Sequence, residues 1–350
     1  MAKKSIRVLR IVIPLVAIIS MAFFVPWGIV KVWISPLPDT VQEQVDAAID
    51  YGLDGVMVYV DQADCEPVIY TAGWKNRENK VPADPQALFK IASISKLYIA
   101  AATAKMVHAG HLSLDKTLAE YLPEFSERIA NADQITLRML VQHRSGIPNF
   151  SDHPDYPWTE PFQNNEDTYQ LVLDQPADFS PDKKYRYSNT NYLLIGEILD
   201  RTLEYSHHQY IKQEILIPLG LSKTYSLLKE VDLAEVMSGY FVGYEKDIKY
   251  NDFIQPGGSM VATIQDVGVF LRALNDGSLL NAEEQAIYSS IYEYEHTGLL
   301  PGYQSIAKYH PDLDAVVVQF VNTSGGNSWT LSELNYKRVM KILRQKAKKG

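Results

Sequence analysis

Two side chains three residues apart could form a nucleophile and its base. Ser93 and Lys96 stand in the segment Ser-Ile-Ser-Lys, and an alanine-rich stretch follows them to residue 108. This composition predicts a helix of about four turns, and side chains three residues apart share one face of a helix. A buried lysine that is partly neutral can accept the serine proton. Ser93 is therefore a candidate nucleophile for acyl transfer.

A serine at the start of a helix also has a simpler interpretation, because serine is a preferred N-cap residue. Lys96 argues against it. A capping box carries Glu or Gln at that spacing, and a lysine in the first turn opposes the helix dipole by about 0.3–1 kcal/mol. An alkoxide at the same helix end would be stabilised by free N–H groups. The chain has no Gly-x-Ser-x-Gly sequence, which argues against an α/β-hydrolase site.

A second motif, Tyr187-Ser188-Asn189, lies in a polar loop just before an apolar helical stretch at residues 192–203. A short loop at the start of a helix can hold side chains over a cleft. Taken alone, Tyr187 has the character of a packing residue, and Asn189 that of a helix cap or turn residue. The order of the motifs along the chain favours the functional interpretation.

A third motif, His296-Thr297-Gly298, precedes two strand-like segments at residues 303–310 and 315–322. Gly298 would let a substrate pass close to the backbone, and the edge of a strand could supply an N–H group to an oxyanion. Taken alone, His296 is typical of a surface or turn position. This motif gains its meaning only from the other two.

The elements that must position these residues form a simple pattern. Strand signals cluster at residues 55–72 and 303–322, and helical patterns fill much of the interval. The pattern predicts an α/β fold of the α+β type: an antiparallel sheet built from both ends of the chain and flanked by terminal helices, with a mainly helical lobe inserted between them. A site at the junction of the two lobes is expected.

The N-terminal end has the features of a membrane segment. Residues 11–30 are almost wholly apolar and follow four basic residues, as in a signal peptide or an anchor. No convincing cleavage site and no cysteine for lipidation accompany this run. We expect an uncleaved anchor and linker over residues 1–36 and an enzyme domain over residues 37–350 outside the cytoplasm; cleavage would make the protein secreted.

Composition excludes several classes of partner and cofactor. Of the 33 basic residues, four precede the apolar run and seven lie at the C-terminal end, so the rest of the chain carries 22 basic and 42 acidic residues. So acidic a body argues against nucleic acid as a partner. The single cysteine, Cys65, excludes an internal disulfide and a cysteine-based zinc site. We expect no metal and no cofactor, and the basic tail is expected to form a helix whose apolar side packs on the sheet.

The motifs together resemble those of the penicillin-recognising serine hydrolases, the group that contains class C β-lactamases, DD-peptidases and related esterases. The resemblance runs from about residue 50 to the C-terminus. It rests on residues 89–96 (FKIASISK), 140–148 (LVQHRSGIP), 187–189 (YSN), 218–221 (PLGL), 257–258 (GG) and 296–298 (HTG).

The resemblance implies a β-lactamase/transpeptidase-like fold and a role for each motif residue. Ser93 would be the acylated nucleophile and Lys96 its proton acceptor, while Tyr187 would carry protons to and from the leaving group. Asn189 would orient Lys96 or the substrate amide, and His296 would polarise or bind a substrate carboxylate. The site would include Thr297 and Gly298, and the backbone N–H groups of Ser93 and Leu299 would form the oxyanion hole.

Two residues depart from the pattern of class C β-lactamases, which carry a lysine at the position of His296 and a small polar residue at that of Leu299. A neutral imidazole binds a carboxylate less strongly than an ammonium does. The sequence therefore predicts a serine hydrolase that acts like a DD-carboxypeptidase or an esterase on a small-molecule or peptide substrate. A class C-type β-lactamase and a catalytically silent wall-binding or sensor protein are the alternatives.

Overall fold

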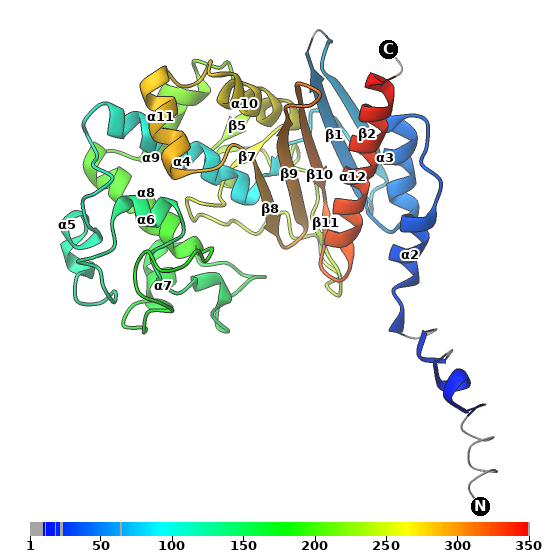
Figure 1. The fold of residues 1–350 in the computed structure, drawn as a ribbon, viewed down its shortest axis with the longest axis horizontal. Coiled ribbons are helices and arrows are strands. Elements are labelled where there is room, and N and C mark those ends of the chain that lie inside the picture. The colour runs from blue at the N-terminus through cyan, green and yellow to red at the C-terminus, as the bar shows by residue number, and fades with distance from the viewer. Residues whose placement is uncertain (1–9, 11, 18, 22–23, 64, 349–350) are drawn as a thin grey trace, which may run out of the picture.

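The structure is a computed structural model that describes residues 10, 12–17, 19–21, 24–63 and 65–348. Its centre is an antiparallel sheet with strand order β3-β2-β1-β10-β9-β8 (Figure 1). The central pair joins the two ends of the chain, with Val56 of β1 opposite Val321 of β10. This confirms the predicted sheet. Its strands are β1 (Gly55–Gln62), β2 (Val68–Asn76), β3 (Val81–Pro82), β8 (His296–Leu300), β9 (Tyr303–His310) and β10 (Ala315–Val321).

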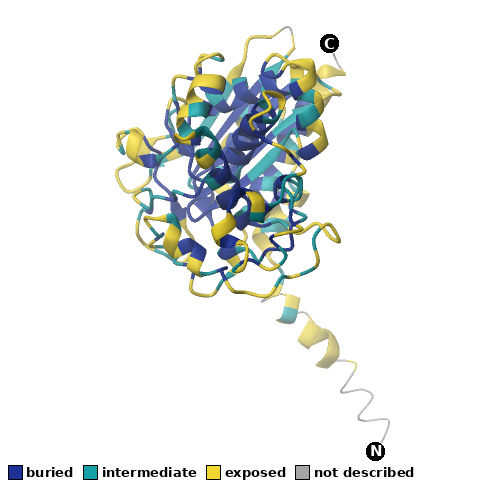
Figure 2. Cartoon of the chain, turned by 90° about the vertical axis from the view of Figure 1, so that its left-hand side faces the viewer, coloured by how far each residue is buried: buried dark blue, intermediate teal, exposed yellow. Residues whose placement is uncertain are grey.

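The two central strands have apolar side chains on both faces of the sheet. Residues 56–60 of β1 and all of β10 are buried, and both read as nearly continuous apolar runs rather than as alternating patterns. Such runs are expected where helices cover both faces of a sheet. Figure 1 shows helices on either side of the sheet, and Figure 2 shows that the sheet lies in the buried interior.

The first face is covered by the terminal helices, α2 (Trp27–Ile34), α3 (Val41–Asp50) and α12 (Ser328–Ala347). Thr40 and Glu43 form a capping box that starts α3. The apolar side of α12, including Val339 and Leu343, packs in one cluster with α3 and the sheet. This confirms the predicted packing of the basic C-terminal helix.

The second face carries α10 (Ile264–Asp276) and, behind it, the inserted lobe with α4 (Ser95–His108) at its centre. Helix α4 has buried residues on every side because α8, α9, η4 and α11 pack around it and its Tyr98 stacks on Phe270 of α10. The other helices of the lobe are α5 (Leu118–Tyr121), α6 (Leu137–Val141), α7 (Asn165–Gln170), α8 (Asn189–Leu203), α9 (His207–Ile211), the π-helical turn η4 (Lys212–Leu216) and α11 (Ala282–Ile291).

Short elements connect the lobe to the sheet. A three-stranded sheet has the order β4-β7-β5, and β11 pairs with β6 in parallel. The strands are β4 (Phe89–Lys90), β5 (Thr224–Tyr225), β6 (Tyr240–Phe241), β7 (Val261–Ala262) and β11 (Thr323–Ser324), and the 3₁₀ turns are η1 (Ala92–Ile94), η2 (Pro123–Phe125), η3 (Phe150–Asp152) and η5 (Leu228–Glu230).

The predicted membrane segment falls partly outside the described residues, at positions 11, 18, 22 and 23. Over the residues that are described, no helix combines the length and apolar character needed to cross a bilayer. Residues 10, 12–17, 19, 21 and 24 are exposed (Figure 2), whereas Val32 of α2 is fully buried against α3 and α12. The anchor, the boundary at residue 36 and the location outside the cytoplasm stay predictions.

Candidate active site

Ser93 lies on the 3₁₀ turn η1, and α4 begins two residues later at Ser95. The helix was predicted to begin at Ser93, so the nucleophile candidate stands just before it. Ala92 has a φ of +52°, a strained conformation for a residue with a Cβ atom. The Ser95 hydroxyl holds the turn, because it donates to Ala92 O at 2.6 Å and accepts from Met260 N at 3.3 Å. Ser95 is thus structural, and Ser93 faces the cleft.

Lys96 is fully buried, and its ammonium nitrogen has three oxygen neighbours. Nζ lies 2.7 Å from Gly257 O, 2.8 Å from Asn189 Oδ1 and 3.1 Å from Ser93 Oγ. Burial lowers the pKa of Lys96 to about 7. A neutral amine has two N–H groups, which the first two oxygens can accept, and its lone pair then faces the Ser93 hydroxyl. The geometry is that of a base beside a nucleophile.

Tyr187 shares a hydrogen bond with Ser93, with 2.7 Å between the phenol oxygen and Oγ. Burial raises the pKa of Tyr187 far above its ordinary value. A phenol that stays protonated cannot start the reaction as an anionic base, but it can pass a proton on. Of the two neighbours of Ser93, Lys96 is therefore the better proton acceptor.

Asn189 is the first residue of α8, which begins three residues earlier than the predicted helical stretch. Three bonds fix its orientation: Oδ1 accepts from Lys96, Nδ2 donates to Ser151 Oγ at 2.9 Å, and its backbone N–H donates to Asn149 Oδ1 at 2.9 Å. The carbonyl side of the amide is thus held toward Lys96.

His143 supports this loop, and the sequence did not single it out. Its Nδ1 accepts a hydrogen bond from Ser188 N at 3.1 Å, and its ring lies 4.5 Å from that of Tyr187 between centroids. The side chain is 2% exposed, and burial lowers its pKa to about 3. His143 is therefore a neutral residue that positions Tyr187. Its motif was noted, but residue type alone could not reveal a contact between positions so far apart in the chain.

The third motif lies on β8, the edge strand beside η1. A Cβ atom at Gly298 would lie 2.2 Å from Ser305 Oγ and 2.5 Å from Ile91 O. The glycine therefore lets the strand itself approach the nucleophile turn, whereas the sequence analysis assigned that space to substrate. Leu299 and Thr297 line the cleft, and the oxyanion role of the Ser93 and Leu299 N–H groups stays a prediction.

His296 is half-buried at the start of β8, and its Nδ1 contacts the carbonyl of Thr297. Its ring stacks on Tyr292 at 5.9 Å and lies 6.3 Å from Tyr187. Burial, followed by the charge of Lys96, lowers the pKa of His296 to about 4. Near neutral pH the imidazole is uncharged, so it offers a hydrogen bond but no positive charge to a substrate carboxylate.

Two hollows meet at Ser93. The smaller, of about 40 Å³, has aromatic walls that include Tyr156 and Trp158, and the larger, of about 580 Å³, is lined by acidic and aromatic residues. Part of the cleft wall thus comes from the loop that follows η3. The carboxylates of the larger hollow belong to Asp152, Glu293 and Glu295, and its one lysine, Lys308, pairs with Glu295 at 2.6 Å.

The structure thus brings Ser93, Lys96, Tyr187 and Asn189 into one connected set of hydrogen bonds, with β8 beside them. Elsewhere in the described part of the chain, no group of three or more His, Cys, Asp or Glu side chains could hold a metal ion. The arrangement is suited to acyl transfer by a serine, and the role of each residue remains a prediction.

Comparisons with known proteins agree with this geometry. Residues 38–290 match the Beta-lactamase family. The chain is 22% identical over 298 residues to Penicillin-binding protein 4* of Bacillus subtilis, covering 79% of this chain and 65% of that protein. It is 26% identical over 189 residues to Protein flp of Staphylococcus aureus, covering 52% of this chain and 38% of that protein. The chain thus spans less than two thirds of the length of either relative.

Two solved structures share the fold. The D-amino acid amidase from Ochrobactrum anthropi SV3, complexed with L-phenylalanine, has a TM-score of 0.76 at 21% identity and covers 88% of this chain and 99% of its own. A penicillin binding protein from Bacillus halodurans has a TM-score of 0.71 at 21% identity, covering 83% of this chain and 96% of its own. These likenesses establish the fold that the sequence analysis predicted.

The environment of Lys96 can be tested at a pair of adjacent glycines. A Cβ atom at Gly257 would lie 2.9 Å from Lys96 Nζ, whereas one at Gly258 meets nothing within 4 Å. We expect Gly257→Ala to displace the amine and lower kcat by about 10²-fold, because small misplacements of catalytic groups are costly. Gly258→Ala should retain most of its activity. Equal activities of the two variants in an ester hydrolysis assay, at matched thermal stability, would contradict this account.

The pH dependence of turnover should report the lowered pKa of Lys96. Only the neutral amine can accept the Ser93 proton, so kcat/KM should rise about ten-fold per pH unit below a pKa of about 7 and level off above it. A pH profile of ester hydrolysis measures this. If His296 were the base instead, the rise would lie near its lower pKa of about 4.

Proposed function

The chain is a serine hydrolase of the beta-lactamase family, and we propose that it cleaves a small amide, ester or peptide through an acyl-enzyme on Ser93. The observation that carries this proposal is the buried amine of Lys96. Its two fixed acceptors leave it one free interaction, with the Ser93 hydroxyl 3.1 Å away.

The proposed reaction uses three side chains. Ser93 Oγ attacks the substrate carbonyl while Lys96 takes the hydroxyl proton. The oxyanion forms against the backbone N–H groups of Ser93 and Leu299, and such a donor contributes about 10² to 10³ in rate. The proton then passes through Tyr187 to the departing amine or alcohol, whose bond to the carbonyl carbon breaks. Water hydrolyses the acyl-enzyme by the reverse proton path.

The charge of the cleft favours one class of substrate. A carboxylate at the His296 end would meet a neutral imidazole and the side chains of Glu293 and Glu295, of which only Glu295 has an ion-pair partner among the described residues. Like charges repel, and desolvation in a cleft strengthens the effect. We therefore place uncharged or cationic amides and esters ahead of D-Ala-D-Ala peptides and β-lactams, both of which carry a carboxylate.

Two other functions remain as alternatives. A DD-carboxypeptidase or β-lactamase is favoured by the three motifs and by the names of the penicillin-binding relatives, but the one lysine in the lining of the larger hollow, Lys308, is already paired with Glu295. A silent wall-binding or sensor protein would need no lowered lysine pKa beside a serine. The likeness in fold to a D-amino acid amidase is consistent with the amide substrates that we propose.

Covalent labelling should identify the nucleophile. We expect an activated ester to leave an acyl adduct on Ser93, seen as an increase in intact mass, and Ser93→Ala to lose the adduct together with about 10³-fold or more of kcat. Ser95→Ala is the matched control, because Ser95 only holds the turn and should keep the adduct at some loss of stability. Labelling of Ser93→Ala at the normal rate would refute the assignment.

Substrate charge should decide turnover. An N-acyl-D-alanyl-D-alaninamide should be cleaved about ten-fold or more faster, in kcat/KM, than the same peptide with a free carboxylate. Glu293→Gln removes a negative charge from the cleft, so it should raise kcat/KM for the free acid and bring the values for the two peptides closer together. A preference for the free acid, unchanged in Glu293→Gln, would instead support a carboxypeptidase.

A further inference from the structure

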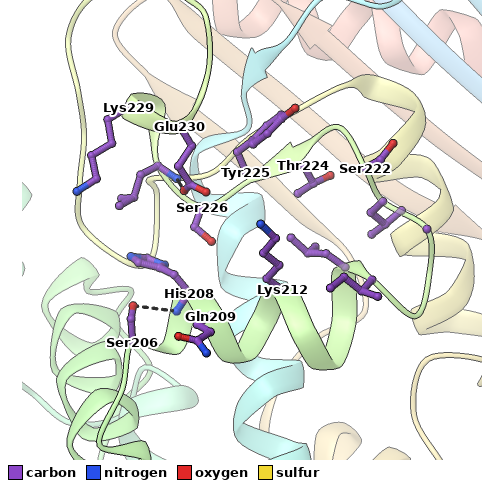
Figure 3. A pocket seen from close by; sticks show the side chains of 15 residues that line it. Ser206, His208, Gln209, Lys212, Ser222, Thr224, Tyr225, Ser226, Lys229 and Glu230 are labelled. Atoms are coloured by element: carbon purple, nitrogen blue, oxygen red, sulfur yellow. Dashed lines mark hydrogen bonds between the residues drawn. The ribbon is translucent and has the colours of Figure 1, made fainter.

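A separate hollow lies apart from the two at Ser93, and none of the proposed catalytic residues line it. Its volume of about 680 Å³ exceeds that of either hollow at Ser93. One wall consists of α9 and the π-helical turn η4, and the other of β5 and η5 with the residues before and between them (Figure 3). π-Helical turns often occur at functional sites, and the volume is within the usual range for small-molecule sites.

Two lysines from opposite walls give this hollow a positive charge. Figure 3 shows Lys212 extending from η4 into the hollow, while Lys229 extends from the opposite side near His208. Neither ammonium forms an ion pair with a described carboxylate, although acidic residues outnumber basic ones in the chain by 42 to 33. The one carboxylate in the lining, Glu230, accepts a hydrogen bond from Leu227 N at 2.7 Å. The lysines are therefore available to an anion.

An unpartnered hydroxyl faces the same space. Ser226 is 4% exposed, its hydroxyl makes no hydrogen bond to any described residue, and Figure 3 shows its oxygen pointing into the hollow. By contrast, Thr224 donates to Asp266 at 2.9 Å, and Ser206 accepts from His208 N at 3.2 Å. The Ser226 hydroxyl is therefore free to form a hydrogen bond with a ligand in the hollow.

The neighbouring imidazole is uncharged. Burial, followed by the charges of His207 and Lys229, lowers the pKa of His208 to about 3. Its ring lies 4.0 Å from that of His207 between centroids. His208 can therefore add a hydrogen bond to a ligand head group near neutral pH, while the charge must come from the two lysines.

The rest of the hollow is apolar. Leu216 and Leu221 are buried in its wall, Leu227 lies beside Ser226 in the chain, and Ile217 at the end of η4 is 64% exposed. A phosphate or carboxylate ion alone would leave Ile217 and the partly exposed Leu227 uncovered. An apolar body attached to the anion would remove them from water, which is favourable.

We propose that this hollow binds an amphiphilic anion, a molecule with a phosphate or carboxylate head and an apolar body. The head contacts Lys212 and the Ser226 hydroxyl, Lys229 on the opposite wall adds to the positive potential, and the body covers Leu227 and Ile217. The site is independent of the acyl-enzyme chemistry, because it shares no residue with the hollows at Ser93.

Calorimetric titration of the full chain tests this with four probes: decyl phosphate, decanoate, inorganic phosphate and decanol, each below its aggregation concentration. We expect decyl phosphate and decanoate to saturate one site. Inorganic phosphate and decanol, which are the head alone and the body alone, should bind at least about ten-fold more weakly. Whichever amphiphile binds more tightly identifies the head group. If inorganic phosphate bound as tightly as decyl phosphate, the apolar body would contribute nothing, and the proposal of an amphiphilic ligand would be overturned.

Variants separate this site from adsorption elsewhere. Lys212→Met and Ser226→Ala should each weaken the binding of decyl phosphate by about ten-fold or more. Lys223→Met is the matched control, because Lys223 does not line the hollow and lies 3.9 Å from Glu235. Ester hydrolysis should be unchanged in all three variants. The proposal would be overturned if decyl phosphate showed no saturable binding. It would also be overturned if Lys212→Met bound decyl phosphate as tightly as the unaltered chain, because the amphiphile would then bind elsewhere.

Discussion

The removal of one lysine side chain from water is the constraint on which the site depends. Lys96 lies on a helix buried among the helices of the lobe, and desolvation makes its charged form costly. Its three oxygen neighbours come from the turn before α4, from the start of α8 and from the glycine segment at residue 257. The base therefore exists only when these distant parts of the chain are folded together.

The same low polarity sets the state of the groups around Lys96. His143 and His296 are held neutral and Tyr187 stays protonated, each chiefly because burial disfavours its charged form. Charge is instead concentrated at the outer wall of the cleft, on Glu293 and Glu295. The reacting centre is thus nearly uncharged, and the surrounding wall decides which substrates approach it.

The parts of the site that follow from local spacing could be predicted from the sequence. Ser93 and Lys96 lie three residues apart on adjoining helical turns, and the sheet strands were visible as apolar runs of strand length. The helix starts at Ser95 and Asn189 were missed because a 3₁₀ turn and a polar first turn do not show in apolar periodicity. The roles of His143 and Gly257 and the hollow beside Lys212 depend on contacts between distant segments, which one sequence does not show.

The sheet that carries the site pairs the first strand of the body with the last long one, β1 with β10. Loop-closure entropy must be overcome before such a pair forms, so a fold with this much non-local pairing assembles slowly. During synthesis β1 has no partner on that side until β10 (Ala315–Val321) has left the ribosome. The helices of the lobe can form earlier, but the turn that carries Ser93 gains its neighbouring strand β8 only after residues 296–300 have followed.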